Sequence, residues 1–200
     1  MIYVMLANGF EEIEALAVVD ILRRAELDVL TVGIGGKTIR GAHGIVVAAD
    51  IGEDEVRDKY LKALILPGGM PGTLRLEHSE TVSRLIDTAI ERDLLIGAIC
   101  AAPSILGHKG LLEGRRVTCF PGFEQELYGA EVLPDTVVED GQLVTAKGAG
   151  AAVAFGLCLV KRLAGEAEAK KLQEAMQCPG RIFVPTRQSC APKAKRGGAA

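Results

Sequence analysis

A cysteine directly after an apolar run is the strongest candidate for chemistry in this sequence. Cys100 follows the run 95–99, and the residues two before and two after it, Ala98 and Ala102, are small. This spacing is typical of a nucleophile elbow, in which a tight strand-to-helix turn projects one reactive side chain. Pro103 suits the first helical turn, where its missing N–H needs no partner. Because the positive end of a helix dipole favours thiolate, the pattern predicts a nucleophilic Cys100; a buried structural cysteine is the alternative.

Glu14 is the second candidate, because it is an acid on an apolar helix face. In the predicted helix 11–25, Glu14 shares one stripe with Val18, Ile21 and Ala25. A buried carboxyl has a raised pKa, stays protonated and can donate a hydrogen bond to a thiolate. The alternative is a carboxylate at the edge of the face that reaches solvent.

Two neighbouring acids have simpler explanations. The dipole at the helix start accounts for Glu11. Glu12 falls on the same side of the helix as Arg23, which predicts a solvated carboxylate.

A glycine pair supplies candidate backbone donors. Gly68 and Gly69 follow an apolar run, where glycine lets the backbone approach a ligand closely with its N–H groups free. Together with the N–H of Ala101 they are predicted to form an oxyanion hole. A plain turn is the alternative.

Ligands of open α/β sheets bind beyond the carboxyl ends of the strands. Two further residues stand at predicted strand ends, Asn8 after the first strand and Lys147 after the last. Both are expected to line the pocket, although a simple turn is the better explanation of the segment 145–148.

Missing motifs narrow the chemistry. The three histidines are His43, His78 and His108, and His108 lies roughly 12 Å along a helix from Cys100. No histidine follows it, so a Cys-His-Glu triad of the amidotransferase type is excluded. The sequence contains no CxxC pair, no GxxxxGK[ST] and no clean GxGxxG. We therefore expect neither a metal nor a cofactor.

The elements that position these residues alternate between strands and helices. This order predicts an α/β fold, a three-layer flavodoxin-like sandwich whose mostly parallel sheet has helices on both faces. An Asp-Gly turn at 140–141 predicts a hairpin. The predicted strands are 2–7, 28–34, 44–50, 62–69, 94–100, 117–120 and 136–146, and the predicted helices are 11–25, 53–60, 79–93, one starting after Cys100, 149–164 and 165–177.

Composition sets the protein class. The 200 residues are 48% hydrophobic and 24% charged, as in globular proteins, and no run is long enough to span a membrane. The net charge of −3 and the absence of tryptophan argue against specific nucleic-acid binding. The N-terminus does not resemble a signal peptide, so a cytoplasmic location is expected. We predict one domain over 1–178 and a flexible extension over 179–200, whose basic stretch 193–196 is alternatively a partner-binding arm.

Four segments carry a resemblance to a known family. ANGFEEIEALAVVDILRRA, ALILPGGMPG, IGAICAAPSIL and TAKGAGAAVAFGL, in this order and spacing, resemble the ThiJ/PfpI superfamily, in the branch of the human parkinsonism-associated deglycase (DJ-one) and its bacterial relatives. The resemblance covers residues 1–178. It implies that Cys100 is the reactive thiol, that Glu14 holds it through a protonated carboxyl, and that Gly68, Gly69 and Ala101 are the backbone donors.

The sequence departs from parts of this superfamily at two positions. Human-type members have a histidine where this chain has Phe120, a feature similar to bacterial and plant members. The protease-like branch has a histidine where this chain has Ala101, which argues against peptidase activity. Phe120 is expected to line the pocket.

The resemblance implies two classes of function. The first is a cofactor-independent glyoxalase or deglycase that acts on methylglyoxal, glyoxal or their early adducts with amines and thiols. In it Cys100 forms a hemithioacetal and Glu14 is the acid and base. The second is an oxidative-stress redox sensor or holdase chaperone that uses oxidation of Cys100. A homodimer is also implied.

Overall fold

A seven-stranded sheet forms the centre of the molecule. The computed structural model describes residues 1–178, so the predicted extension 179–200 lies outside the described residues. The strand order is β10-β11-β7-β6-β1-β2-β5, and all neighbouring pairs are parallel except β10 with β11, which confirms the predicted α/β fold. The strands are β1 (Ile2–Leu6), β2 (Val29–Gly33), β5 (Ile51–Gly52), β6 (Ala63–Leu66), β7 (Leu95–Ile99), β10 (Val137–Asp140) and β11 (Leu143–Ala146).

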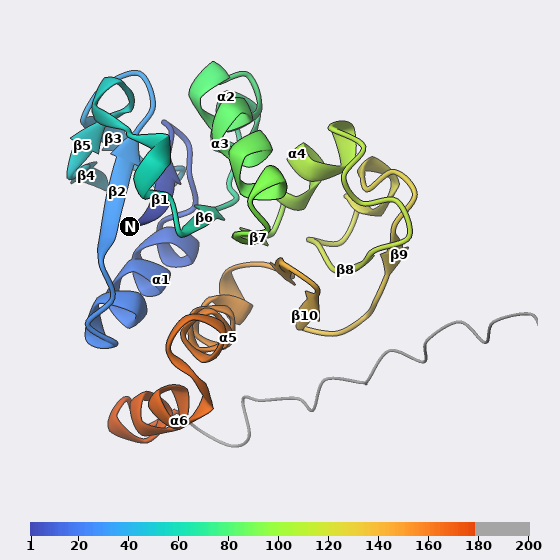
Figure 1. Cartoon of the computed structure of the whole chain (residues 1–200). Coiled ribbons are helices and arrows are strands. Elements are labelled where there is room, and N and C mark those ends of the chain that lie inside the picture. The colour runs from blue at the N-terminus through green and yellow to red at the C-terminus, as the bar shows by residue number, and fades with distance from the viewer. Residues whose placement is uncertain (179–200) are drawn as a thin grey trace, which may run out of the picture.

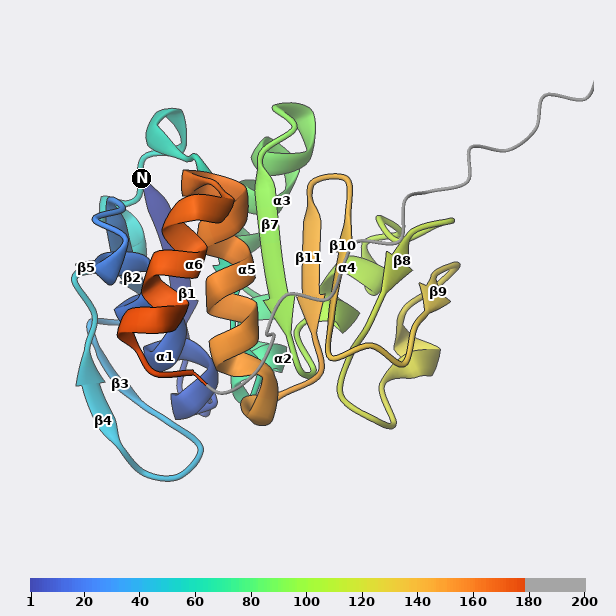
Figure 2. The same ribbon diagram turned by 90° about the horizontal axis from the view of Figure 1, so that it is seen from below.

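Helices cover both faces of this sheet. Figures 1 and 2 show α1, α5 and α6 on one face and α2, α3 and α4 on the other. Within residues 1–178, no helix has both the length and the apolar character needed to cross a bilayer. The helices are α1 (Glu12–Arg24), α2 (Gly72–Glu77), α3 (Glu80–Glu91), α4 (Pro103–His108), α5 (Ala152–Ala164) and α6 (Glu166–Ala175).

The sandwich has two hydrophobic cores because successive side chains of a strand point to opposite faces. In β1, Val4 and Leu6 pack into the core under α1 and α5, whereas Tyr3 and Met5 pack into the core under α3. All residues of β1 are buried, as expected for a strand covered on both sides.

Two predicted strands pair outside the central sheet. The segment predicted at 44–50 contains β4 (Val46–Ala48), which forms a separate antiparallel hairpin with β3 (Thr38–Arg40). Val46 and Ala48 are exposed, so this segment lacks the two covered faces of a central strand. The segment predicted at 117–120 overlaps β8 (Arg116–Val117), which pairs only with β9 (Glu131–Val132).

The single helix predicted at 53–60 is wrong. Two short 3-10 turns, η1 (Glu53–Glu55) and η2 (Asp58–Tyr60), stand there instead. Val56 separates them in an extended conformation, and its side chain is buried in the core. Burial of this one apolar side chain thus interrupts the helix. Two further 3-10 turns are η3 (Glu124–Glu126) and η4 (Ala149–Ala151).

Candidate active site

Cys100 occupies a strained turn between β7 and α4. Its φ angle is +65°, in the left-handed region that side chains rarely adopt. The backbone is held on both sides, since the N–H of Cys100 donates to the carbonyl of Ala146 (2.9 Å) and its own carbonyl accepts from the N–H of Phe120 (2.9 Å). The side chain is half-buried. These features give the geometry of a nucleophile elbow.

Glu14 brings a buried carboxyl to this turn from α1. The residue is 1% exposed, so its carboxyl does not reach solvent at the edge of the helix. Its Oε2 accepts a hydrogen bond from the N–H of Gly68 at 2.9 Å, and the carboxyl also hydrogen-bonds the thiol of Cys100. The start of α1 is fixed by Glu11, whose carboxylate caps the helix by accepting from the N–H of Glu14 (2.7 Å). The structure therefore brings Cys100 and Glu14 together.

The three predicted backbone donors divide into two roles. The N–H groups of Gly69 and Ala101 donate to the sulfur of Cys100. The oxyanion-hole prediction required a free N–H at Gly68. This N–H donates to Glu14 instead, so it is not available to a substrate oxygen. Glycine at position 68 allows Cys100 and Glu14 to approach the backbone closely. A Cβ there would lie 2.6 Å from both the Cβ of Cys100 and the Oε2 of Glu14, which is too close.

Burial shifts both titrating groups upward. Burial, with a smaller contribution from the charge of Glu11, raises the pKa of the Glu14 carboxyl to about 7, against the hydrogen bonds from Cys100 and Gly68. Burial, followed by the charge of Glu14, raises the pKa of the Cys100 thiol to about 12, against the two backbone N–H groups. The sequence predicted that the helix dipole lowers the pKa of the Cys100 thiol. This prediction is wrong while Glu14 is charged, because burial and the Glu14 charge raise that pKa.

The two groups titrate as a pair. The repulsion from Glu14 exists only while Glu14 is charged, so the two pKa values belong to the loss of a first and a second proton. Between about pH 7 and pH 12 the pair holds one proton and one negative charge. The charge is on sulfur or on oxygen according to which group the hydrogen bonds favour.

The remaining predicted pocket residues lie at different places. Asn8 is exposed, and its side-chain oxygen accepts from the N–H of Arg40 (2.8 Å), so it supports the β3 hairpin rather than Cys100. Lys147 acts electrostatically on Cys119, lowering a thiol pKa that burial raises to about 11. Phe120 is joined to Cys100 by its backbone and is 48% exposed.

The prediction of a solvated Glu12 is wrong, because this residue is 4% exposed. Its Oε1 accepts from the N–H groups of His43 and Ile45, and its Oε2 lies 2.9 Å from Nδ1 of His43. A Cβ at Gly41 would lie 2.2 Å from this carboxylate, so the turn after β3 closes over it. The sequence contains no pattern that indicates this contact, because Glu12 and His43 are 31 residues apart.

Glu11, Glu12 and His43 also form a potential metal-ligand group. One atom from each lies within 4.8 Å of the others. The atoms of Glu12 and His43 already bond each other, and Glu11 caps α1. These contacts explain the cluster as the clasp between α1 and the turn at 41–45.

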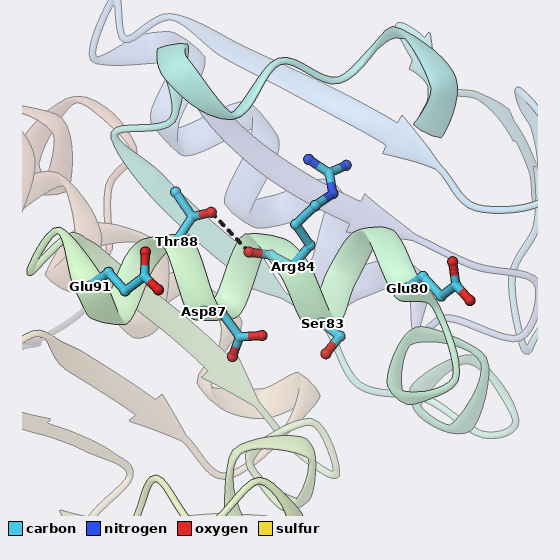
Figure 3. Close-up of a pocket in the computed structure, with 6 residues that line it drawn as sticks. All are labelled: Glu80, Ser83, Arg84, Asp87, Thr88 and Glu91. Atoms are coloured by element: carbon cyan, nitrogen blue, oxygen red, sulfur yellow. Dashed lines mark hydrogen bonds between the residues drawn. The ribbon is translucent and has the colours of Figure 1, made fainter.

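A surface hollow of about 440 Å³ runs along α3 (Figure 3). Its lining residues are polar or charged, and the Thr88 hydroxyl in it donates to the carbonyl of Arg84 (2.9 Å). None of the residues around Cys100 belongs to it. The lining residues are Glu80, Ser83, Arg84, Asp87, Thr88 and Glu91.

The fold and the elbow define an α/β sandwich with a cysteine–glutamate pair at the ends of its strands. Residues 1–162 match the profile of the DJ-1/PfpI family, and the chain belongs to this family. It is 34% identical to Protein dj-1beta of Drosophila melanogaster over 174 residues, covering 86% of this chain and 91% of that protein. It is also 34% identical to the Glutathione-independent glyoxalase DJR-1.2 of Caenorhabditis elegans, covering 81% and 87%.

Solved structures give the same relationship. A cysteine-to-alanine variant of the DJ-1 superfamily protein STM1931 from Salmonella typhimurium superimposes with a TM-score of 0.85 at 34% identity, covering 90% of this chain and 98% of that one. Some relatives are longer: the chain spans 39% of Protein DJ-1 homolog B of Arabidopsis thaliana, to which it is 32% identical over 84% of its own length. The relatives, one of them a named glyoxalase, support a DJ-1-type function.

Proposed function

We propose that this protein is a cofactor-independent glyoxalase that converts 2-oxoaldehydes such as methylglyoxal to 2-hydroxy acids. The observation that carries the proposal is the buried Glu14 carboxyl hydrogen-bonded to the half-buried Cys100 thiol. This pair supplies a nucleophile and a proton carrier in one place, without any histidine. The similarity to a glyoxalase that is described as glutathione-independent supports the same reaction.

The first step joins substrate to sulfur. We propose that the reactive form of the singly protonated pair has its charge on Cys100 and its proton on Glu14. The pKa values of about 12 and about 7 make this the minor form, and the N–H groups of Gly69 and Ala101 stabilise it. The thiolate adds to the aldehyde carbon of methylglyoxal, a C–S bond forms, and the carbonyl electron pair moves to oxygen. The N–H groups of Gly69 and Ala101 stand beside the sulfur to stabilise this oxyanion. The oxyanion takes the Glu14 proton, which gives a neutral hemithioacetal.

The second step moves hydrogen between two carbons. The Glu14 carboxylate removes the proton from the carbon attached to sulfur and passes it to the oxygen of the neighbouring carbonyl, which gives an enediol. It then removes the proton of the hydroxyl on the sulfur-bearing carbon and delivers it to the neighbouring carbon. The product is a thioester of lactate with Cys100. Water hydrolyses the thioester, releases lactate and restores the thiol, so that the sum is methylglyoxal plus water to lactate. A carboxyl pKa near 7 suits a group that must both accept and donate this proton.

The direct test is lactate formation from methylglyoxal without glutathione. Wild type is expected to form lactate, and Cys100→Ala and Glu14→Gln are expected not to. Wild-type protein without turnover would overturn the glyoxalase proposal. Turnover retained in Cys100→Ala would show that the sulfur is not the nucleophile. In the deglycase form of the proposal, adducts of the aldehyde are substrates in addition to the free aldehyde. Measuring how much free lysine amine is restored in a glycated peptide tests this form.

The same sulfur favours a second candidate function, redox sensing. Hydrogen peroxide oxidises a thiolate to a sulfenate and water, and a second peroxide gives a sulfinate. The N–H groups of Gly69 and Ala101 and a protonated Glu14 are suited to the oxygens of that product. A solved relative, 31% identical, is described as oxidized Toxoplasma gondii DJ-1. A protein without turnover whose Cys100 oxidises readily to sulfinate would support this candidate.

A homodimer stays a prediction. Apolar side chains exposed on α1 and in the β3–β4 hairpin, Ile13 (57%), Ile45 (53%) and Val46 (49%), are available for such an interface. Sedimentation equilibrium of wild type and of Ile13→Glu tests it: a mass of two chains that falls to one in the variant is expected, and a single-chain wild type would contradict it.

A further inference from the structure

Phe120 is a large apolar residue left half-exposed next to the turn that carries Cys100. Phe120 is one of five phenylalanines in the sequence, and it is 48% exposed. The N–H of Phe120 donates to the carbonyl of Cys100 at 2.9 Å, so the two residues are fixed to each other through their backbones. The backbone of Phe120 is therefore fixed next to the elbow.

The space next to Gly148 locates the ring relative to Glu14. A Cβ placed on Gly148 would lie 3.2 Å from Cδ2 of Phe120 and 3.7 Å from Oε1 of Glu14. The φ angle of Gly148 is 163°, which any residue can adopt, so backbone strain does not require glycine here. What glycine provides is a small space bordered by both the aromatic ring and the carboxyl group.

A second exposed apolar residue follows one of the backbone donors of Cys100 in the chain. Met70 follows Gly69, whose N–H donates to the sulfur of Cys100, and Met70 is 46% exposed. Exposed apolar side chains next to a candidate nucleophile are more informative than isolated ones elsewhere on a surface, because binding sites for small molecules are mostly apolar.

The proposed reaction requires the substituent of the substrate to lie in this region. Glu14 must reach both the carbon bound to sulfur and the neighbouring carbon, and the neighbouring carbon bears the substituent. Because the space beside the Glu14 carboxyl is bordered by the Phe120 ring, the substituent and the ring share it.

We propose that Phe120 determines substrate preference, by packing its ring against the substituent of a 2-oxoaldehyde and so favouring apolar and aromatic substituents over hydrogen. The proposal rests on the proposed function. Phe120 has no titratable group, so its part is in binding, and all proton transfer falls to Glu14. An aryl substituent gains offset stacking or edge-to-face contact with the ring, which a hydrogen atom does not make.

Steady-state kinetics with three substrates test this inference. Wild type, Phe120→Leu and Phe120→Ala are compared on glyoxal, methylglyoxal and phenylglyoxal. In Phe120→Ala, the ratio of kcat/KM for phenylglyoxal to that for glyoxal is expected to fall about three- to tenfold, mainly through KM, as expected for loss of one aromatic contact. Phe120→Leu, which keeps an apolar surface, is expected to fall between. An equal loss on all three substrates, or an unchanged ratio, would overturn the proposal.

A second measurement needs no turnover, so that failure of the glyoxalase proposal can be told apart from failure of this one. Cys100 is alkylated with phenacyl bromide, which carries a phenyl ketone, and with iodoacetamide, which does not. In each case the sulfur displaces the halide and an S–C bond forms. Mass spectrometry of the Cys100 peptide gives both rates. The rate ratio is expected to fall about three- to tenfold in Phe120→Ala. The melting temperature of the variant is measured as a check on folding. If the variant melts as wild type does and the ratio of the two rates is unchanged, the Phe120 ring does not bind the aromatic reagent, and the proposal is wrong.

Discussion

Two thiol–carboxyl pairs in this chain have similar contacts and different surroundings. Cys100 hydrogen-bonds Glu14, and Cys158 on α5 hydrogen-bonds Glu139 on β10. Burial is the largest cause of a raised thiol pKa at both, and the neighbouring glutamate adds to it. A thiol next to a glutamate is therefore not enough to define an active site.

The carboxyl groups of the two pairs differ in their partners. Glu139 has two cations, Lys161 at 2.6 Å and Arg162 at 3.8 Å. No ion pair to Glu14 is present within residues 1–178, and the nearest charge acting on it is that of Glu11, which favours the protonated form. Glu139 is thus held by two ion pairs, whereas Glu14 can hold a proton near neutral pH.

The sulfur atoms differ as well. Cys158 lies within α5, is 5% exposed and has no backbone N–H among its interactions. Cys100 stands at a turn with φ of +65°, half-buried, with the N–H groups of Gly69 and Ala101 on its sulfur. We therefore expect the reactive cysteine to be the one whose carboxyl partner has no cation and whose sulfur has backbone donors.

The largest effect is expected from removing each sulfur in turn. Cys100→Ala should reduce lactate formation to the uncatalysed background, because no covalent intermediate can form. Cys158→Ala should keep wild-type kcat/KM and lose about 1 kcal/mol of unfolding free energy through a small cavity. The measurements are the lactate assay and urea unfolding. Equal losses of activity in both variants would remove the distinction between the pairs.

The next largest effect is expected from replacing each of the two carboxyl groups by an amide. Glu14→Gln should lower kcat about 10²- to 10⁴-fold, the usual range for a general acid–base group. Glu139→Gln should leave kcat within about twofold, because its contacts with Lys161 and Arg162 are structural. Circular dichroism checks folding of both. A Glu139→Gln variant as inactive as Glu14→Gln would contradict a special role for the carboxyl without a cation.

Glu14→Gln should also change stability, in a direction that depends on pH. The fold raises the pKa of this carboxyl from 4.5 to about 7. A raised carboxyl pKa means that the fold favours the protonated form, so this contribution is present below about pH 4.5 and is lost as the pH rises through 7. The glutamine variant should therefore match wild type at pH 4 and exceed it at pH 8, by on the order of 3 kcal/mol at most. Urea unfolding at both pH values is the measurement, and a variant less stable than wild type at pH 8 would contradict a Cys100–Glu14 pair whose negative charge is disfavoured by burial.

A methyl group between the two partners of the first pair should weaken it. In Gly68→Ala the added Cβ meets both Cys100 and Glu14 at 2.6 Å, which should cost about 1–3 kcal/mol of stability and reduce turnover. Gly150→Ala is the matched control, because nothing lies within 4 Å of a Cβ there. Thermal unfolding and the lactate assay are compared. Wild-type behaviour of Gly68→Ala would mean that the pair is less tightly packed than the structure describes.

Much of this arrangement could be predicted from local sequence. The run 95–99 with small residues around Cys100 predicts the elbow, and the position of Glu14 on the apolar stripe of α1 predicts its burial, because both signals depend on short-range periodicity. Alternating apolar runs and helices likewise predict the parallel sheet, and the Asp-Gly turn predicts the β10–β11 hairpin.

Other features depend on contacts between distant segments. Glu12 is buried by the turn at 41–45, and Val56 splits a predicted helix by entering the core. The N–H of Gly68 points to Glu14 rather than to a substrate, which only the packing of α1 against the end of β6 decides. The thiol pKa also needs the full set of neighbours, because burial and the Glu14 charge outweigh the backbone donors.

The Cys100–Glu14 pair loses its first proton near pH 7, and we propose that the form that reacts carries the charge on sulfur and the proton on Glu14. The most direct test is the rate of Cys100 alkylation by iodoacetamide between pH 5 and pH 11, followed by mass spectrometry of that peptide, in wild type and Glu14→Gln. The wild-type rate is expected to rise with a midpoint near pH 7 and then level off, and this step is expected to disappear in Glu14→Gln. A wild-type rate without a step near pH 7 that still climbs above pH 10 would mean that thiolate forms only when the second proton is lost, which would contradict the proposed reactive form.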